Sequence, residues 1–336
     1  MSGFNDFYGQ SGIIGHIKNA INMNKISHAY IINGEAGMGK KMMAKTFAMT
    51  LQCEKQKDEP CMECRSCKQT LTMNQPDIKW VTHEKIGLIS VDEIREQVNS
   101  DIQIKPYSSK YKIYIIDEAE KMNDAAQNAL LKTIEEPPVY GIIILLTTNS
   151  NMLLSTILSR CVELNLRPVK DDIIKRYLME KSHVPDYQAD MAVAFSGGNL
   201  GKAIKMATSS EFEELKNNVL QLVRNISSMT VAQMADLIKT AEKNKDGIDE
   251  YLDVLRNWYR DVLIYKATGD EKGVIFKEEM PHIRKQARQL SYESIENIVS
   301  AIDKVKIRLK SNVNFEMVIE ILYLTMREGF ARNDKK

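Results

Sequence analysis

Long apolar runs and an excess of charge of one sign are both missing from this 336-residue sequence. Apolar runs such as residues 142–146 are far too short to span a bilayer. Lys and Arg total 46 against 45 Asp and Glu, so no overall field attracts the chain to nucleic acid or membrane. The N-terminal MSGFNDFYGQ lacks the charged and apolar segments of a secretion signal. We therefore expect a cytoplasmic protein without a membrane partner.

Proline becomes scarce along the chain, and beyond Pro185 only Pro281 remains. From about Glu211 onward, apolar side chains recur at the i, i+3, i+4 spacing of amphipathic helices. This part is expected to be entirely helical. Two sets show the period: Tyr251, Leu252, Leu255, Trp258, Tyr259, Val262 and Leu263, then Ile295, Ile298, Val299, Ile302 and Val305.

The N-terminal part alternates between short apolar runs and helical patterns. Residues 28–33, 112–116 and 142–148 read as strands, and residues 42–51 read as a helix. Asn123 or Asp124 can cap a further helix that ends before Pro137. Strands that alternate with helices predict an α/β domain with a parallel sheet covered by helices.

A glycine-rich loop, GEAGMGK, joins the first expected strand to the first expected helix. This is the context of a phosphate-binding P-loop, in which Gly34, Gly37 and Gly39 expose backbone N–H groups and Lys40 reaches the terminal phosphates. The pattern requires Ser or Thr next, because that hydroxyl coordinates Mg²⁺, but this chain has Lys41. The loop therefore leaves ATP and Mg²⁺ binding open and argues against hydrolysis.

Two carboxylates, Asp117 and Glu118, follow the strand at residues 112–116. In P-loop ATPases such an acid holds Mg²⁺, and the next carboxylate can polarise the attacking water. The alternative is a solvated acidic helix start, which would be stable for electrostatic reasons alone. The upstream P-loop favours the ATPase ancestry, and Glu118 is a candidate catalytic residue, either active or vestigial.

Four of the five cysteines crowd into residues 53–67. Cys61, Cys64 and Cys67 form two overlapping C-x-x-C turns, and Cys53 ends the preceding helix. Such spacing predicts a closed, structural Cys₄ zinc site, and free thiols in a loop are the alternative.

The tripeptide Ser159-Arg160-Cys161 follows the third strand after a short helical turn. An arginine there could project toward a nucleotide held by a neighbouring subunit. An isolated Ser-Arg pair is more often a surface feature than an arginine finger, so the spacing alone is a weak signal.

Together these segments resemble bacterial clamp-loader subunits, and more narrowly the delta-prime branch of that AAA+ family. The resemblance is dense from residue 4 to residue 168. It rests on HAY at 28–30, the loop at 34–41, the four cysteines, QPD at 75–77, DEAEKM at 117–122, NALLKTIEEPP at 128–138 and SRC at 159–161.

The resemblance implies an AAA+ P-loop domain over residues 1–167 with the zinc module at 53–67. It also implies a helical lid over residues 168–208 and a helical collar over residues 209–330, which joins five subunits. Residues 331–336 are expected to be a disordered tail. The implied partners are the delta and tau/gamma subunits in a hetero-pentamer, the sliding clamp, and primed DNA reached through the complex.

The resemblance further implies that Arg160 acts in trans on the ATP of a neighbouring motor subunit. Motor subunits carry Ser or Thr where this chain has Lys41, and a lid arginine where it has Gly201. The expected function is therefore that of a non-motor subunit, itself a weak or inactive ATPase, within a DNA-directed DNA polymerase, a nucleotidyltransferase holoenzyme.

Two alternatives stay open. The first is an ATP-hydrolysing motor subunit of the same complex, which Lys41 and Gly201 disfavour. The second is a stand-alone P-loop ATPase or kinase. A kinase needs several arginines to clamp a second phosphate, but only Arg65 and Arg95 precede Arg160.

Overall fold

The computed structural model describes residues 3–83, 87–243, 247–309 and 313–331. The chain divides into two compact units, residues 1–174 with 198–202 and residues 175–197 with 203–336. Of the expected disordered tail, residues 332–336 lie outside the described residues.

A sheet of five parallel strands forms the centre of the first unit, in the order β2-β3-β4-β1-β5. This confirms the predicted parallel α/β architecture. Sequence reasoning missed β2 and β5. The bounds are Ala29–Asn33 (β1), Ile78–Val81 (β2), Lys112–Ile116 (β3), Gly141–Thr147 (β4) and Val162–Asn165 (β5).

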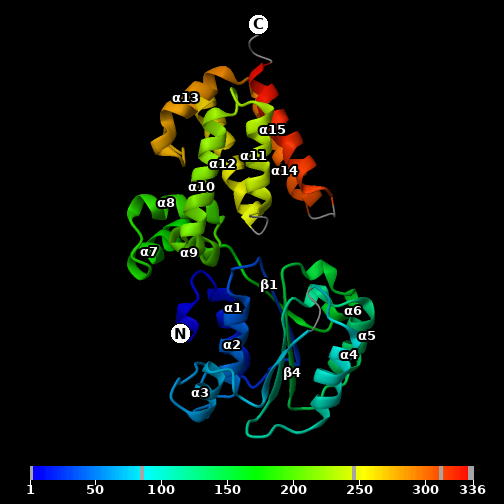
Figure 1. The fold of residues 1–336 in the computed structure, drawn as a ribbon. Helices are drawn as coiled ribbons and strands as arrows, with labels where there is room; N and C mark the ends of the chain where they lie inside the picture. Colours follow the sequence, from blue (N-terminus) through cyan, green and yellow to red (C-terminus); the bar gives the residue numbers. More distant parts are fainter. Residues whose placement is uncertain (1–2, 84–86, 244–246, 310–312, 332–336) are drawn as a thin grey trace. The chain divides into compact units, whose positions relative to one another are not determined.

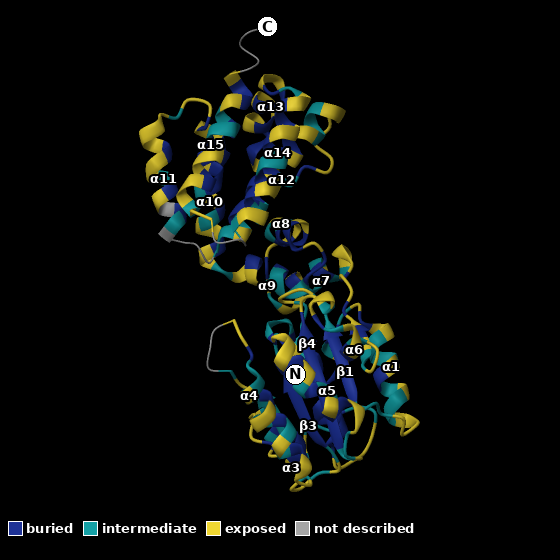
Figure 2. Cartoon of the chain, turned by 90° about the vertical axis from the view of Figure 1, so that its right-hand side faces the viewer, coloured by how far each residue is buried: buried dark blue, intermediate teal, exposed yellow. Residues whose placement is uncertain are grey.

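Helices cover both faces of this sheet (Figure 1). One face packs against α1 (Ser11–Asn22) and α2 (Lys40–Leu51), and the other packs against α4 (Val91–Ile94), α5 (Asp124–Glu135) and α6 (Ser155–Leu158). Burial on both faces explains why the central strands are apolar throughout rather than alternating. Figure 2 shows β1, β3 and β4 as buried.

The carboxyl ends of β1, β3 and β4 lie next to one another because these strands are neighbours in the sheet. The glycine-rich loop follows β1, Asp117 follows β3, and Thr148 follows β4. In parallel α/β sheets, ligands bind at this edge. The fold therefore brings these three segments together at one edge.

The second unit is helical, as predicted from residue 211 onward. Its central helix, α12, buries Trp258, whose Nε1 donates to Oε1 of Gln286 at 2.9 Å. Leu263 is 39% exposed, although the periodic pattern places it with the buried residues. The bounds are Asp171–Lys181 (α7), Asp186–Ser196 (α8), Leu200–Thr208 (α9), Ser210–Asn225 (α10), Val231–Lys243 (α11), Ile248–Thr268 (α12), Met280–Gln289 (α13), Tyr292–Leu309 (α14) and Phe315–Ala331 (α15).

The helices α7, α8 and α9 occupy the segment for which a three-helix lid was expected. The first residues of both α7 and α9 belong to the first unit, and the remainder of each helix belongs to the second. The proposed borders between the P-loop, lid and collar domains stay predictions. None of the helices among the described residues has both the length and the apolar character needed to cross a membrane.

Candidate functional site

The glycine-rich loop has the backbone conformation of a strand-to-helix turn. Gly37 and Gly39 have φ angles of 88° and 93°, in the left-handed region that favours glycine. Lys40 begins α2, and its Nζ donates to the carbonyl oxygens of Gly34 at 2.6 Å and Glu35 at 3.0 Å. Burial lowers the pKa of Lys40, and nearby carboxylates oppose this shift. The candidate phosphate-binding ammonium is therefore bound to carbonyl groups of its own loop.

Lys41 points to the end of β3. Its Nζ lies 2.6 Å from Oδ2 of Asp117, and the hydrogen bond to that carboxylate raises the pKa of Lys41. The Lys41 side chain is 69% exposed, so water weakens the pair. Even so, the carboxylate expected to hold Mg²⁺ already has a cation at contact distance.

The neighbouring carboxylate, Glu118, also has partners. It has a φ of 50°, and its Oε2 lies 2.7 Å from Nζ of Lys121 and 3.8 Å from Nε2 of His83. The group that would polarise water in an ATPase is thus held beside two basic side chains.

A third carboxylate at this edge, Glu120, was missed by sequence reasoning. Its Oε1 accepts hydrogen bonds from the backbone N–H and the hydroxyl of Thr148, at 3.2 and 2.5 Å. Burial would raise the pKa of Glu120, but these hydrogen bonds outweigh burial and lower it. Its position after β3 was the available signal, but the contact to the end of β4 depends on the tertiary fold.

The turn before α9 lies directly against the loop. Asn199, which is 1% exposed, donates from Nδ2 to the carbonyl oxygen of Ala36 at 2.7 Å. Its Oδ1 accepts from the backbone N–H of Lys202 at 3.1 Å. A Cβ atom on Gly201 would lie 2.2 Å from the carbonyl oxygen of Gly37. In this arrangement, position 201 has no room for any side chain, including an arginine.

Arg160 follows α6 and lies on the surface of the first unit. Its Nη1 donates to the carbonyl oxygen of Thr156 at 3.0 Å and to Oγ of Ser159 at 3.2 Å. Its Nη2 lies 2.9 Å from Oε1 of Glu135, and the side chain is 41% exposed. Among the described residues, no hydrogen bond or ion pair joins Arg160 to the P-loop. The structure thus brings the predicted nucleotide-site residues together and leaves Arg160 outside that group.

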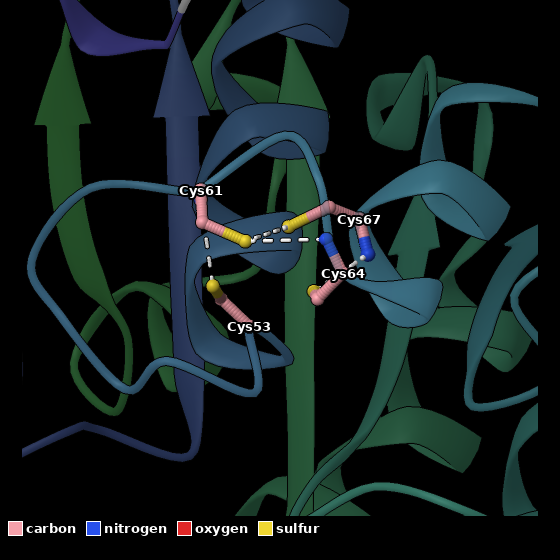
Figure 3. A group of neighbouring side chains, drawn as sticks. All are labelled: Cys53, Cys61, Cys64 and Cys67. Carbon is pink, nitrogen blue, oxygen red and sulfur yellow. Dashed lines mark hydrogen bonds between the residues drawn. The ribbon is translucent and has the colours of Figure 1, made fainter.

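Cys53, Cys61, Cys64 and Cys67 converge on one point (Figure 3). Their sulfur atoms all lie within 4.8 Å of one another, and Cys61 and Cys67 are 3.9 Å apart. Tetrahedral coordination at a Zn–S distance of about 2.3 Å requires sulfur atoms roughly 3.8 Å apart, so the four thiols fit a metal ion of this kind.

Backbone N–H groups support the negative charge that metal-bound sulfur atoms carry. The N–H groups of Cys61, Cys64 and Cys67 donate to the sulfur atoms of Cys53, Cys61 and Cys64 at 3.3–3.4 Å. Such donors lower the pKa of Cys61 to about 6. Burial instead raises the pKa of Cys67. A bound cation would lower that pKa again, because it stabilises the thiolate.

Two protein-family models match the chain. The model described as "DNA polymerase III, delta subunit" matches residues 9–170, and the model described as "DNA polymerase III, delta subunit, C terminal" matches residues 210–327. DNA polymerase III subunit delta' of Bacillus subtilis (strain 168) is 30% identical over 319 residues, 93% of this chain and 94% of that protein. A gamma subunit-related protein of known structure from Thermotoga maritima is 19% identical, covers 94% of this chain and 99% of its own, and has a TM-score of 0.46.

DNA polymerase III subunit tau of the same Bacillus strain is 28% identical over 357 aligned positions. The match covers 98% of this chain but only 62% of tau, so the chain spans less than two thirds of that relative. The two family models and the delta' subunit of Bacillus subtilis, which is matched over nearly its full length, all indicate the same family. The chain belongs to the delta-prime subunits of DNA polymerase III, a family of clamp-loader subunits.

Proposed function

We propose that this clamp-loader subunit is not a motor. It scaffolds a hetero-pentamer with delta and tau/gamma subunits, and it supplies Arg160 to the ATP site of a neighbouring motor subunit. Through the complex it helps to load the sliding clamp onto primed DNA during replication.

The observation that carries the non-motor role is the ion pair between Lys41 and Asp117. A working site needs a hydroxyl and a carboxylate around Mg²⁺, whereas here a lysine replaces the hydroxyl and binds the carboxylate. A Mg-nucleotide would have to displace the Lys41 ammonium from Asp117. It would also have to draw Lys40 away from the carbonyl groups of Gly34 and Glu35.

If ATP and Mg²⁺ bind at all, the loop glycines Gly34, Gly37 and Gly39 with Lys40 would hold the phosphates, and Asp117 would hold the metal ion. The bound nucleotide would supply a negative charge that orders the loop. The chain would still lack a lid arginine, because Gly201 stands at that position and contacts Gly37.

The trans role of Arg160 is supported by its exposure and by its separation from the contacts of the P-loop. A guanidinium group on the surface can approach the γ-phosphate of a neighbouring subunit and stabilise the charge that develops there. Arginine fingers are worth ~10³–10⁵-fold in rate where they act.

The four cysteines are proposed to hold one structural Zn²⁺. The four thiolates would fill all four ligand positions of such an ion, so none would remain open for catalysis. Bound zinc would supply folding free energy to a loop that contains only the short helix α3 (Arg65–Leu71).

The test is steady-state ATP hydrolysis by the isolated chain, with and without primed DNA. The proposal expects no turnover above background, and it expects normal turnover by the reconstituted complex. Similarity to tau over 98% of this chain favours the motor alternative. Turnover by the isolated chain at the rate of the assembled loader would establish that alternative.

A further inference from the structure

Two glutamates stand at the end of α5, close to Arg160. Glu135 is the last residue of the helix, and Glu136 directly follows. Only Glu135 contacts Arg160, with 2.9 Å between Oε1 and Nη2. Glu136 is also exposed, but no hydrogen bond or ion pair of its side chain occurs in the described part of the chain. The pair offers a matched comparison of two adjacent carboxylates.

Arg160 is held from two elements. Its own turn contributes the carbonyl oxygen of Thr156 and the hydroxyl of Ser159, both bound by Nη1. The α5 helix contributes Glu135, bound by Nη2. The remaining N–H groups of the guanidinium have no partner within the described ranges of the chain, and the side chain is 41% exposed, so these groups can meet a ligand.

We propose that Glu135 is a positioning residue for Arg160. This inference rests on the proposed trans role of Arg160. Without Glu135, the long side chain would be tethered only by its own turn and would sample many orientations. With Glu135, the guanidinium is already oriented before a neighbouring ATP site forms around it. Preorganised donors stabilise a transition state better than donors that must first be ordered.

The expected effect is modest because both partners are about half exposed. Exposed ion pairs contribute little, so removing this one should lower the Arg160-dependent rate by about two- to fivefold. The loss should fall on kcat for ATP and not on KM, because the finger stabilises charge that develops during the reaction. Glu135→Asp should retain part of the rate, since it keeps the charge on a shorter side chain.

The experiment measures DNA-stimulated ATPase in reconstituted complexes that contain the full-length chain. The Arg160-dependent part is the difference between the wild-type complex and the Arg160→Ala complex. Glu135→Gln should remove about half to four fifths of that part. Glu136→Gln, the matched control, should remove none. Combined with Arg160→Ala, Glu135→Gln should cause no further loss, because it acts only through Arg160.

The outcomes separate the two hypotheses. If Arg160→Ala leaves the rate unchanged, the proposed trans role fails. If Arg160→Ala lowers the rate but Glu135→Gln matches Glu136→Gln, only the positioning role is overturned. A higher rate in Glu135→Gln would show that Glu135 restrains the finger, and an added loss in the double variant would show a merely structural role. Either result overturns the inference.

Discussion

The Nζ atom of Lys41 lies 2.6 Å from Oδ2 of Asp117, at the edge of the sheet where a P-loop ATPase holds its magnesium ion. The hydrogen bond raises the pKa of Lys41, so the ammonium stays charged at neutral pH. One substitution thus removes a metal ligand and also provides the remaining carboxylate with a cation.

Replacing Lys41 by Thr should strengthen Mg-nucleotide binding. The change restores the hydroxyl and frees Asp117, and we expect an affinity gain on the order of tenfold by calorimetry, about 1.4 kcal/mol. Full hydrolysis should not return, because Gly201 stands where the resemblance to motor subunits implies an arginine. The gain should disappear in EDTA, since it depends on the metal ion. Equal affinities of the two proteins in Mg²⁺ would show that something other than Lys41 closes the site.

The second prediction concerns the contact between Gly201 and Gly37. In Gly201→Ala, the new Cβ would lie 2.2 Å from the Gly37 carbonyl oxygen, so backbone must move. We expect a loss of about 1–3 kcal/mol in the free energy of unfolding from urea titration. Amide hydrogen exchange over residues 34–40 should also accelerate.

The matched control for that variant is Gly15→Ala. Gly15 lies inside α1, and a Cβ there would meet no atom within 4 Å. Alanine favours helix over glycine by roughly 1 kcal/mol, so this variant should be neutral or slightly more stable. If Gly201→Ala and Gly15→Ala have the same free energy of unfolding, Gly201 does not pack against the glycine-rich loop in solution.

Much of this edge could be predicted from sequence, because a P-loop is a local pattern of strand, glycines and helix. Strands β3 and β4 were predicted for a similar reason, since burial on both faces makes them continuously apolar. Strands β2 and β5 were missed. Each lies at an edge of the sheet, spans four residues and is only partly buried, so neither shows a long apolar run.

Contacts between distant segments could not be predicted from local patterns. Asn199 and Ala36 are 163 positions apart, and the hydrogen bond between them depends on the turn at Asn199 reaching the glycine-rich loop. Glu135 lies in a motif that sequence reasoning recognised, yet only the fold shows its contact with Arg160. Periodicity likewise cannot reveal which flank of an apolar stripe stays open to solvent, as at Leu263.

The zinc prediction is that the purified chain carries about one Zn²⁺, bound by four thiolates. Cys64→Ser should release the metal ion and reduce stability, because metal binding contributes to the folding of such modules. Elemental analysis under reducing conditions measures the content. Cys161→Ser is the control and should retain the metal ion, since Cys161 lies outside the cluster and burial raises its pKa to about 12. The zinc site would be refuted if the wild-type protein is purified without metal and is no more stable than Cys64→Ser.

The final prediction tests Arg160 itself. Arg160→Ala should fold and join the proposed hetero-pentamer, because the side chain is largely a surface group whose partners are Glu135 and its own turn. The defect should appear in DNA-stimulated ATPase and clamp loading by the assembled complex. In the proposed hetero-pentamer the loss should be partial, because the resemblance implies that other subunit interfaces carry their own arginines. Arg160→Lys should rescue poorly, since an ammonium lacks the planar fork that spans two phosphate oxygens.

Arg95→Ala serves as the control for that experiment. Arg95 is also exposed and faces an acidic partner, Asp92, at 3.8 Å, so its removal makes the same change in charge on the same unit. A merely electrostatic effect on assembly would lower loading in both variants, whereas a finger role lowers it only in Arg160→Ala. Normal assembly with a wild-type loading rate in Arg160→Ala would mean that Arg160 is a surface residue without a role in the neighbouring site.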